Sequence, residues 1–432
     1  MRVGAVAVGT LLAAVIAASG ASAADPDPSQ YCVGDGGPLG IATDAEHTVL
    51  IGDPPLPVGV RTGRVTVAGV STRVQQAGPP GAKEAIVFVH GSPDSSRDWD
   101  QLVALNGRFA RTVAFDISGY GKSDKNAPQI QTTDGAAKYI QGVLDQLGIK
   151  HAVLVVHDFG GIWGLQWAVK HTHSLLGAVL IDTGVLIDSV PHPSAVIWAT
   201  PIAGELQMAS TTRPSWRADF RAHNPPSMPD AYIDLLYDYY DRATRCAALR
   251  YYRSASQNFM TLGREQAAVL KPLDLPALVI WGRQDPYVLV DQAQKQKEAF
   301  PHARIEILDG SAHWPHIDDP KRVRELVVPF LRPTLSASLG RAGPARVDVR
   351  VTVAGMLPAY RVTASLAGSS TAPQTVSRKR TLSIRLRHPL SAGLHTITVR
   401  ALGLPARRLK LRVAAPLRTG SEHHEQRDPD DR

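Results

Sequence analysis

The sequence predicts an α/β domain followed by a smaller all-β domain, and three features of its pattern support this fold class. From Arg64 onward, short β-branched segments alternate with helical segments, which is typical of a mostly parallel sheet flanked by helices. Between Thr183 and about Leu262 this alternation stops, and helix-forming and aromatic clusters predict a helical cap over the sheet. After Pro333, hydrophobic and polar residues alternate between Gly, Ser and Pro turns, which predicts a small β-sandwich.

Each expected element has its own local pattern. Short apolar runs predict strands of the first domain at residues 64–67, 85–89, 112–116, 152–156, 177–181, 277–281 and 304–308. Helices with one apolar face are expected at 133–147, 161–171, 290–300 and 320–331. In the second domain, period-two runs predict strands at 346–353, 359–366, 381–386, 393–399 and 408–413. The predicted domains are therefore 61–332, with the cap at about 184–262, and 333–417.

The positive charge of the chain lies in the second domain. The 432 residues include 47 basic and 39 acidic side chains, which gives a formal net charge of +8. Residues 333–420 contain fifteen Lys and Arg but a single acid, Asp348, whereas residues 1–332 are slightly acidic. Because the larger domain has no basic excess, we expect no nucleic-acid partner.

The N-terminus has the features of an export signal. Arg2 precedes an apolar and small-residue run over 3–18, and Ala-Ser-Ala at 21–23 is the pattern that a signal peptidase cleaves. Asp-Pro-Asp-Pro at 25–28 could not continue a buried helix. We therefore expect a signal peptide at 1–24, an extension at 25–60, and a secreted or cell-envelope protein. An uncleaved membrane anchor is the alternative.

The sequence also bears on a possible disulfide, on cofactors and on the C-terminal tail. Outside the cell, Cys32 and Cys246 could pair, but the sequence does not give the distance between them. The sequence has no Cys/His metal cluster, Gly-rich phosphate loop or dinucleotide fingerprint, so we expect no cofactor. The charged segment 418–432 is expected to be disordered.

A carboxylate lies at a turn between a predicted strand and a predicted helix. In Val-His-Asp-Phe-Gly-Gly at 156–161, the strand runs directly into the helix and Asp158 occupies the turn, at a sheet edge where α/β proteins bind ligands. The free N–H groups and positive dipole end of the helix favour an ionised carboxylate there. Such a carboxylate can act as a nucleophile. A helix cap is the alternative role for Asp158.

Two further polar clusters follow later strands and complete a candidate triad. Asp285 follows the strand at 277–281, and His313 follows the strand at 304–308. Either residue alone is usually structural, but nucleophile, acid and histidine in this order reproduce a hydrolase triad. After the strand at 85–89, the backbone N–H of Ser92 could form an oxyanion hole with that of Phe159.

From about residue 61 to 332 the chain resembles the α/β-hydrolase fold family. The resemblance rests on the strand-to-helix turn at Asp158, which we call the elbow, and on two further motifs. These are Asp-x-x-Gly-x-Gly-x-Ser at 116–123, and His-Trp-Pro at 313–315 followed by Asp-Pro at 319–320. It implies an α/β-hydrolase fold with a helical cap and a nucleophile at the elbow. The second domain is expected to be an immunoglobulin-like sandwich.

The elbow departs from the pattern of most family members. Those members have Ser or Cys at the elbow with Gly two positions earlier, whereas this chain has Asp158 and Val156 and contains no Gly-x-Ser-x-Gly. In this respect the elbow is similar to that of epoxide hydrolases and haloalkane dehalogenases. A carboxylate that attacks saturated carbon leaves an ester on the enzyme, which water activated by His313 and Asp285 would hydrolyse. The expected substrate is a small apolar epoxide or alkyl halide.

Several positions favour an epoxide over a halide. Haloalkane dehalogenases hold the halide with a Trp directly after the nucleophile and a second Trp or Asn, but this chain has Phe159 and Ser92 there. His157, before the nucleophile, is more similar to the epoxide hydrolases. Leu-Arg-Tyr-Tyr-Arg at 249–253 resembles their second cap-tyrosine segment, which implies that Tyr252 is an acid.

The remaining pocket residues are less well specified by the sequence. The first cap tyrosine has no clear match, because no Tyr occurs between Asp158 and Ala231. We further expect His90 and Trp314 to line the substrate pocket. Tyr232, Tyr237, Tyr239 or Tyr240 could take the place of the missing tyrosine, and the alternative is that these rings pack a cap helix on the core.

These observations predict an exported hydrolase that opens an epoxide to a diol through an ester at Asp158. Haloalkane dehalogenase or another hydrolase of this fold is the alternative, and a non-catalytic cell-envelope binding protein is a further one. The basic clusters at 378–380 and 407–408 could bind anionic cell-wall polymer or lipid headgroups. They could equally form a solvated face without a partner.

Overall fold

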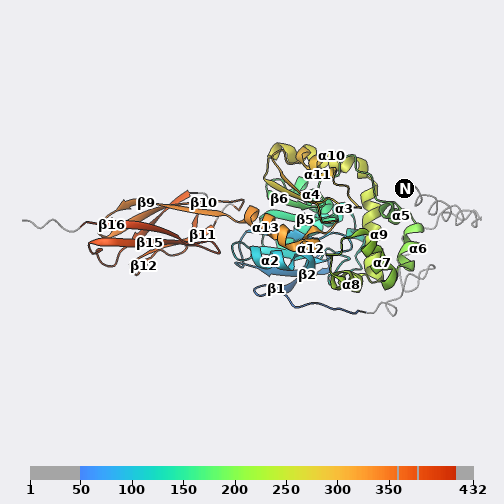
Figure 1. The fold of residues 1–432 in the computed structure, drawn as a ribbon, viewed down its shortest axis with the longest axis horizontal. Coiled ribbons are helices and arrows are strands. Elements are labelled where there is room, and N and C mark those ends of the chain that lie inside the picture. The colour runs from blue at the N-terminus through green and yellow to red at the C-terminus, as the bar shows by residue number, and fades with distance from the viewer. Residues whose placement is uncertain (1–48, 358–359, 377–378, 415–432) are drawn as a thin grey trace, which may run out of the picture.

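The computed structural model of the protein describes residues 49–414, apart from 358–359 and 377–378. The expected signal peptide, Cys32 and the C-terminal tail lie outside these residues. In the described part, an α/β domain with a helical cap is followed by two antiparallel sheets (Figure 1). The predicted fold class is confirmed.

An eight-stranded sheet forms the centre of the α/β domain, in the order β1-β2-β4-β3-β5-β6-β7-β8. Strands β1, β2 and β4 pair antiparallel, and the pairs from β4 through to β8 are parallel. The central strands are buried on both faces, so they consist of nearly continuous apolar runs. The eight strands are β1 (Arg61–Val67), β2 (Val70–Ala77), β3 (Glu84–Val89), β4 (Thr112–Phe115), β5 (His151–His157), β6 (Leu175–Ile181), β7 (Ala277–Gly282) and β8 (Arg304–Leu308).

Helices cover both faces of this sheet and create two hydrophobic cores. Neighbouring residues of one strand, such as Leu154 and Val155, belong to opposite cores because strand side chains alternate. One core includes α3 (Thr133–Gln146) and α4 (Phe159–Lys170), and the other includes α2 (Asp100–Asn106) and α13 (Pro320–Leu331). The carboxyl ends of the parallel strands are left free to carry a site.

The cap lies between β6 and β7. Its helices bury an aromatic cluster that includes Trp216, Tyr240 and Trp314, the last of which belongs to the α/β domain. The helical region extends to Leu270, beyond the expected end at about 262. Its helices are α5 (Pro193–Ala199), α6 (Ala203–Ser210), α7 (Arg213–His223), α8 (Asp230–Tyr239), α9 (Arg242–Ser256) and α10 (Phe259–Leu270).

The second domain consists of two antiparallel sheets that share a core of alternate strand residues, among them Val349, Val362 and Val399. One sheet has the order β14-β10-β9, and the other has β12-β11-β15-β16 with β13 paired to β11. Its strands are β9 (Thr334–Ala342), β10 (Arg346–Ala354), β11 (Tyr360–Leu366), β12 (Ser369–Ser370), β13 (Gln374–Val376), β14 (Lys379–Arg385), β15 (Gly393–Ala401) and β16 (Arg407–Val413).

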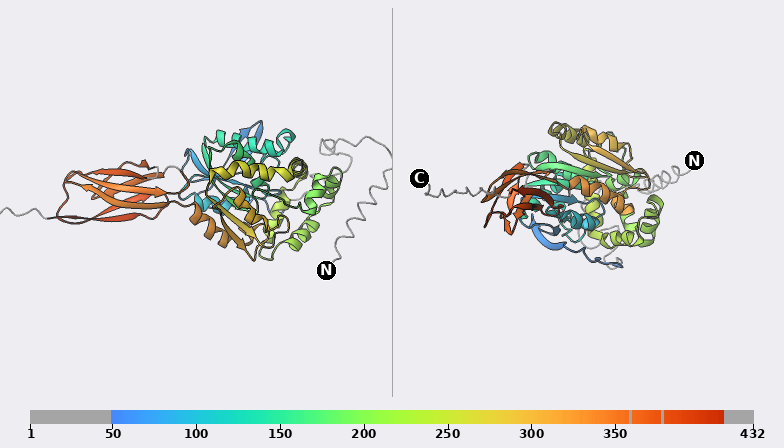
Figure 2. Two further views of the ribbon diagram at one scale, coloured as in Figure 1. Left: turned by 90° about the horizontal axis from the view of Figure 1, so that it is seen from above. Right: turned by 60° about the vertical axis from the view of Figure 1, so that its left-hand side comes forward.

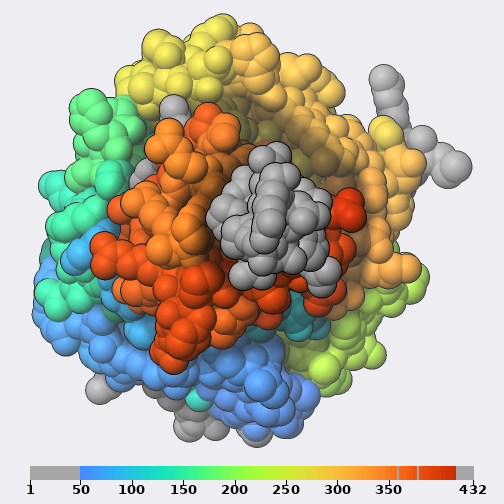
Figure 3. All heavy atoms as spheres, turned by 90° about the vertical axis from the view of Figure 1, so that its left-hand side faces the viewer, coloured from blue at the N-terminus to red at the C-terminus, as the bar shows by residue number. Residues whose placement is uncertain are grey.

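The second domain lies at the end of the molecule opposite to the cap (Figures 1 and 2). Viewed end-on, it stands in front of the larger domain (Figure 3). The two domains touch closely at Gly403, where an added Cβ would lie 1.9 Å from the carbonyl oxygen of Arg108. Among the residues that the structure describes, no helix is long and apolar enough to cross a membrane.

Candidate active site

Asp158 occupies a tight turn between β5 and α4, with φ 46° and ψ −125°. Few non-glycine residues adopt this backbone conformation, which is common at functional sites. The turn needs glycines beside it: a Cβ at Gly160 would lie 2.3 Å from the Val89 carbonyl oxygen, and one at Gly161 would lie 2.1 Å from Thr183 Oγ1. The Asp158 side chain makes no capping hydrogen bond to the helix, so the capping interpretation is wrong.

His313 links Asp158 to Asp285. His313 Nε2 lies 3.4 Å from Asp158 Oδ2, and Nδ1 lies 2.8 Å from Asp285 Oδ2. The other oxygen of Asp285 accepts the backbone N–H groups of Tyr287 at 2.8 Å and Val288 at 3.0 Å. A histidine held between a carboxylate at an elbow and a second, fixed carboxylate has the geometry of a nucleophile, a base and its orienting acid.

Asp158 and His313 shift each other's pKa in opposite directions. Burial by itself would lower the pKa of His313, but the carboxylates of Asp285 and Asp158 raise it well above its usual value. Burial would raise the pKa of Asp158, but His313 and the Ser92 N–H lower it below its usual value. At neutral pH these two shifts favour an ionised Asp158 beside a protonated His313. An ester at Asp158 would remove one of these carboxylates, which would lower the pKa of His313 and make it a base.

One backbone N–H group binds the Asp158 carboxyl, and a second belongs to the next residue in the chain. The N–H of Ser92 donates to Asp158 Oδ1 at 2.8 Å. Phe159 is the first residue of α4, so its N–H has no acceptor within the helix. These are the two residues expected to form the oxyanion hole, and their N–H groups could stabilise an oxyanion formed on the Asp158 carboxyl carbon.

Gly91 allows this close approach, and we predict that Gly91→Ala will reduce kcat/KM by about 10²-fold because it displaces the carboxylate. A Cβ at this position would lie 2.5 Å from Asp158 Cβ and 2.6 Å from Oδ1. Gly310→Ala is the control, since no atom lies within 4 Å of its Cβ position. Steady-state kinetics and thermal unfolding of both variants test this. Equal kcat/KM for the two variants would show that the turn at Asp158 accommodates the added methyl group without displacing the carboxylate.

A second buried pair positions the loop that carries His313. Nε2 of His157 is 2.7 Å from the carbonyl oxygen of His313, and Nδ1 is 2.9 Å from Asp94 Oδ2. The indole N–H of Trp314 donates to the other oxygen of Asp94 at 3.0 Å. His157 thus fixes the backbone of the loop that carries His313. Asp94 is a site residue that the sequence reasoning missed.

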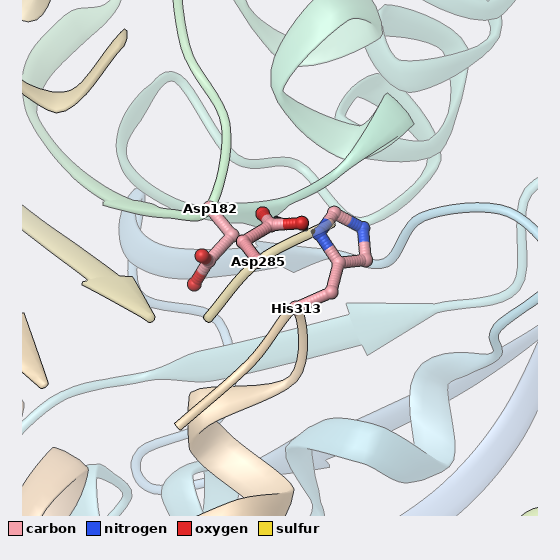
Figure 4. Close-up of side chains that lie close together, drawn as sticks. All are labelled: Asp182, Asp285 and His313. Atoms are coloured by element: carbon pink, nitrogen blue, oxygen red, sulfur yellow. Dashed lines mark hydrogen bonds and ion pairs between the residues drawn. The ribbon is translucent and has the colours of Figure 1, made fainter. Parts of the chain in front are cut away.

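A third carboxyl, that of Asp182, lies beside Asp285 (Figure 4). Oxygens of Asp182 and Asp285 and a nitrogen of His313 all lie within 4.8 Å of one another. Three such groups could hold a metal ion. However, Asp285 already binds Nδ1 of His313 at 2.8 Å, which is the contact that a triad requires. We therefore assign Asp285 and His313 to the triad with Asp158, and Asp182 to a position beside it.

A cavity of about 840 Å³ lies between the cap and the carboxyl edge of the sheet. Asp158 and His313 line it, as do Phe159, Ser92 and Trp314. The cap contributes mostly apolar and aromatic side chains, and polar groups from α6 and α7. The cap residues include His192, Trp198, Ala199, Gln207, Trp216, Asp219, Phe220, Tyr240, Tyr252 and Phe259.

Tyr252 lines this cavity and packs against Phe159, the residue that follows Asp158. Its ring centroid is 4.6 Å from that of Phe159 and 4.8 Å from that of Trp198. Burial and the charge of Asp158 raise the pKa of Tyr252 well above its usual value, so the phenol stays protonated. Tyr287, which the sequence reasoning missed, also lines the cavity, with its ring 5.1 Å from that of His313.

Of the four tyrosines considered for the missing cap acid, only Tyr240 lines the cavity, and its hydroxyl lies 2.6 Å from Met208 Sδ. The other three hydroxyls bind groups elsewhere: Tyr232 donates to Asp98, Tyr237 to the carbonyl of Thr211, and Tyr239 to Asp53.

The prediction that His90 lines the pocket is wrong. His90 is completely buried, with Nδ1 2.7 Å from the Gly91 carbonyl oxygen and Nε2 accepting the N–H of Ile117 at 3.0 Å. It fixes the loop before Ser92 and does not contact the cavity. Cap residues His192 and Trp198 do line the cavity, and no local sequence signal distinguishes them from other cap residues.

The fold and the site together define a hydrolase with a carboxylate at the nucleophile position. Residues 86–326 match the model of the alpha/beta hydrolase family, which is more than half of the chain, and the protein belongs to this family. The resemblance that the sequence suggested is confirmed.

Individual relatives agree with this class. A 2-hydroxy-6-oxononadienedioate/2-hydroxy-6-oxononatrienedioate hydrolase of Paraburkholderia phymatum is 26% identical over 276 residues, 62% of this chain and 93% of that protein. Epoxide hydrolase 1 of Caenorhabditis elegans is 23% identical over 274 residues, 58% of this chain and 65% of that protein. The structure of the haloalkane dehalogenase DatA from Agrobacterium tumefaciens has a TM-score of 0.54 and 20% identity, and covers 63% of this chain and 96% of that chain. At that identity, the structural likeness shows the fold alone.

Proposed function

We propose that the protein is an epoxide hydrolase that works through a covalent ester at Asp158. The observation that carries this proposal is the position of the Asp158 carboxyl group at the elbow, between the Ser92 N–H at 2.8 Å and the His313 imidazole at 3.4 Å. The similarity to Epoxide hydrolase 1 supports the substrate class. The charged triad argues against a non-catalytic binding protein.

In the first step, an oxygen of Asp158 attacks an epoxide carbon. The carbon–oxygen bond of the ring breaks, and the released alkoxide takes the hydroxyl proton of Tyr252. The cavity wall around Asp158 is largely apolar, which suits a small apolar epoxide. The product of this step is a hydroxyalkyl ester of Asp158, and the tyrosinate takes the proton of the resting His313 imidazolium, which leaves His313 neutral.

In the second step, His313 takes a proton from water, and the hydroxide attacks the ester carbonyl. The Ser92 and Phe159 N–H groups hold the tetrahedral oxyanion. When it collapses, the diol oxygen leaves with the proton from His313. The second water proton, left on the Asp158 carboxyl, passes to His313, so the resting state of Asp158, His313 and Tyr252 is restored. Water and epoxide thus give one diol, and one carboxyl oxygen of Asp158 is replaced by water oxygen.

Tyr252→Phe is expected to reduce the rate of ester formation by about 10²-fold, because the alkoxide loses its proton donor. Pre-steady-state kinetics with an epoxide would measure this rate. Tyr239→Phe is a matched control, since the Tyr239 hydroxyl binds Asp53 away from the cavity. If the two variants form the ester equally fast, another group supplies the proton.

A panel of small epoxides and haloalkanes, analysed for diol and for released halide, tests the substrate class. Diol formation without halide release supports the proposal. Halide release without diol formation would identify a haloalkane dehalogenase and contradict the proposal. The second candidate, haloalkane dehalogenase, is favoured by one observation. The indole N–H of Trp198 is buried at the cavity without a hydrogen-bond partner in the part of the chain that the structure describes, so it could hold a halide.

We also propose that the protein is exported and that its second domain attaches it to a phosphate-rich polymer of the cell envelope. The supporting observation is the outer face of the β11-β15-β16 sheet, which strand pairing defines. Thr363 pairs with Arg400, and Thr396 pairs with Lys410. These strands contain no Asp or Glu. The exposed cations of this face are Arg361, Arg400, Arg408, Lys410 and Arg412.

The composition of this face favours a linear polyanion over other partners. Its outward residues include Thr and Ser hydroxyls but no aromatic ring, whereas single-stranded nucleic acids are usually bound by stacking on aromatic residues. Its exposed apolar surface consists mainly of the Leu394 side chain, which is too little to insert into a membrane. Guanidinium groups bind phosphate well. Attachment here would leave the cap at the free end of the molecule (Figure 1).

Reversing three charges on this face, with Arg400→Glu, Arg408→Glu and Arg412→Glu, should weaken binding to long-chain polyphosphate by about 10-fold or more at low salt. Wild-type binding should disappear at about 0.5 M salt. Arg346→Glu, Arg350→Glu and Arg385→Glu make the same charge change on the other sheet. Equal losses in the two triple variants would contradict a specific face, and stronger binding to anionic vesicles would contradict the choice of partner.

A further inference from the structure

We propose that Asp182 is a positioning residue of the triad: a neutral carboxylic acid whose O–H donates a hydrogen bond to the Asp285 carboxylate. This inference concerns the charge state of the site and holds whichever substrate the enzyme takes. Three side chains carry it, those of Asp182, Asp285 and His313, which come from the loops after β6, β7 and β8 (Figure 4).

Strand pairing fixes the position of Asp182. It directly follows β6, which runs parallel to β7. The N–H of Asp182 donates to the Ile280 carbonyl at 3.0 Å, and the N–H of Gly282 donates to Asp182 Oδ1 at 2.9 Å. Asp182 is therefore held against the end of β7 by its backbone N–H and by one carboxyl oxygen, and Asp285 follows that strand.

Only one oxygen of Asp182 has a donor. Oδ2 is buried, and no described group donates a hydrogen bond to it. An ionised Asp182 would leave this oxygen unsatisfied and would place two like charges within 4.8 Å of each other in a site without exposure. A proton on Oδ2 removes the repulsion and turns the oxygen into a donor, with Asp285 as the neighbouring acceptor.

The groups that face Asp182 favour protonation of its carboxyl group. The titratable ones are Asp285 and His313. Burial and the charge of Asp285 raise the pKa of Asp182 well above its usual value, although His313 opposes them. Asp285 then accepts hydrogen bonds from two backbone N–H groups, from His313 and from Asp182. This donor set keeps Asp285 anionic and in place, so that it orients His313 without taking its proton.

Infrared spectroscopy tests the protonation state without any substrate. At neutral pH, the difference between wild type and Asp182→Asn should contain the C=O stretch of a protonated carboxyl group. Asp100→Asn is the control for a buried acid outside the site, since burial raises the pKa of Asp100 to about 6. An Asp182→Asn difference spectrum with only a carboxylate band would show that Asp182 is ionised and would overturn the proposal.

Kinetics test the hydrogen bond itself. The amide of Asp182→Asn still offers an N–H donor, so ester hydrolysis should stay within about threefold of wild type. Asp182→Leu has no donor, so His313 should keep its proton to higher pH. In the pH profile of kcat, the decrease on the acidic side should then begin about one pH unit higher. At a fixed pH within that decrease, kcat should be about tenfold lower than in the wild type. If Asn and Leu slow hydrolysis equally, Asp182 acts as a carboxylate and the proposal is wrong. Failure to turn over epoxides would refute the proposed function and leave the infrared result standing.

Discussion

His313→Gln will accumulate a covalent ester at Asp158 and lose turnover by about 10⁴-fold or more. The first step needs the ionised nucleophile and the proton donor Tyr252. Loss of the His313 charge weakens the lowering of the Asp158 pKa, so ester formation should slow but not stop, because the Ser92 N–H still donates to this carboxylate. The second step needs a base, and the variant has none at this position. Intact-mass measurement after mixing with an epoxide should therefore show one adduct per protein molecule, with the mass of the whole substrate.

The adduct mass also separates the two candidate chemistries. An epoxide adds all of its atoms to the enzyme, whereas a haloalkane adds only its alkyl group because the halide departs. His302→Gln, which changes an exposed histidine, should turn over normally and show no adduct. Full turnover by His313→Gln would mean that a different residue activates the water.

Asp158→Ala will abolish both ester formation and turnover, a loss of about 10⁴-fold or more. The variant should remain folded, because the buried cores on the two faces of the sheet do not include this side chain. His313 loses one of the two carboxylates that raise its pKa, so its pKa should fall. Product analysis, circular dichroism and an NMR titration of His313 measure the three outcomes.

Asp309→Ala is the matched control for this variant. Asp309 is an exposed carboxylate in the loop that leads to His313, where it pairs with Arg283. Its removal should leave turnover within about threefold of wild type, as is usual for an exposed ion pair. Residual turnover by Asp158→Ala with a wild-type product would show that the ester at Asp158 is not an obligatory intermediate.

The sequence allowed the central strands to be predicted because parallel strands buried on both faces are short apolar runs. Strand β2 was missed, since buried polar residues such as Thr72, Arg73 and Gln75 interrupt its hydrophobic pattern. The elbow at Asp158 could be recognised because its glycines and its carboxylate are contiguous. Asp285 and His313 could be recognised because each follows a predicted strand.

The remaining site residues depend on contacts between distant segments. Trp198 and His192 reach the cavity only because of the way α5 folds over the sheet, and Tyr287 looks from sequence like an ordinary turn residue. His90 lies next to the oxyanion-hole loop in sequence, but its side chain points into the core. Asp182 follows a strand as Asp285 does, and only its orphaned oxygen distinguishes it from a capping or turn residue.

The central claim, a covalent ester at Asp158, is tested most directly by a single turnover in heavy-oxygen water, with the enzyme in excess over an epoxide. Hydrolysis of the ester at its carbonyl places the water oxygen in the Asp158 carboxyl group. The account predicts that mass spectrometry of the peptide containing Asp158 will show this label, and that the first diol released will carry none. Label in the diol and none in Asp158 would mean that water attacks the substrate directly, which would contradict the account.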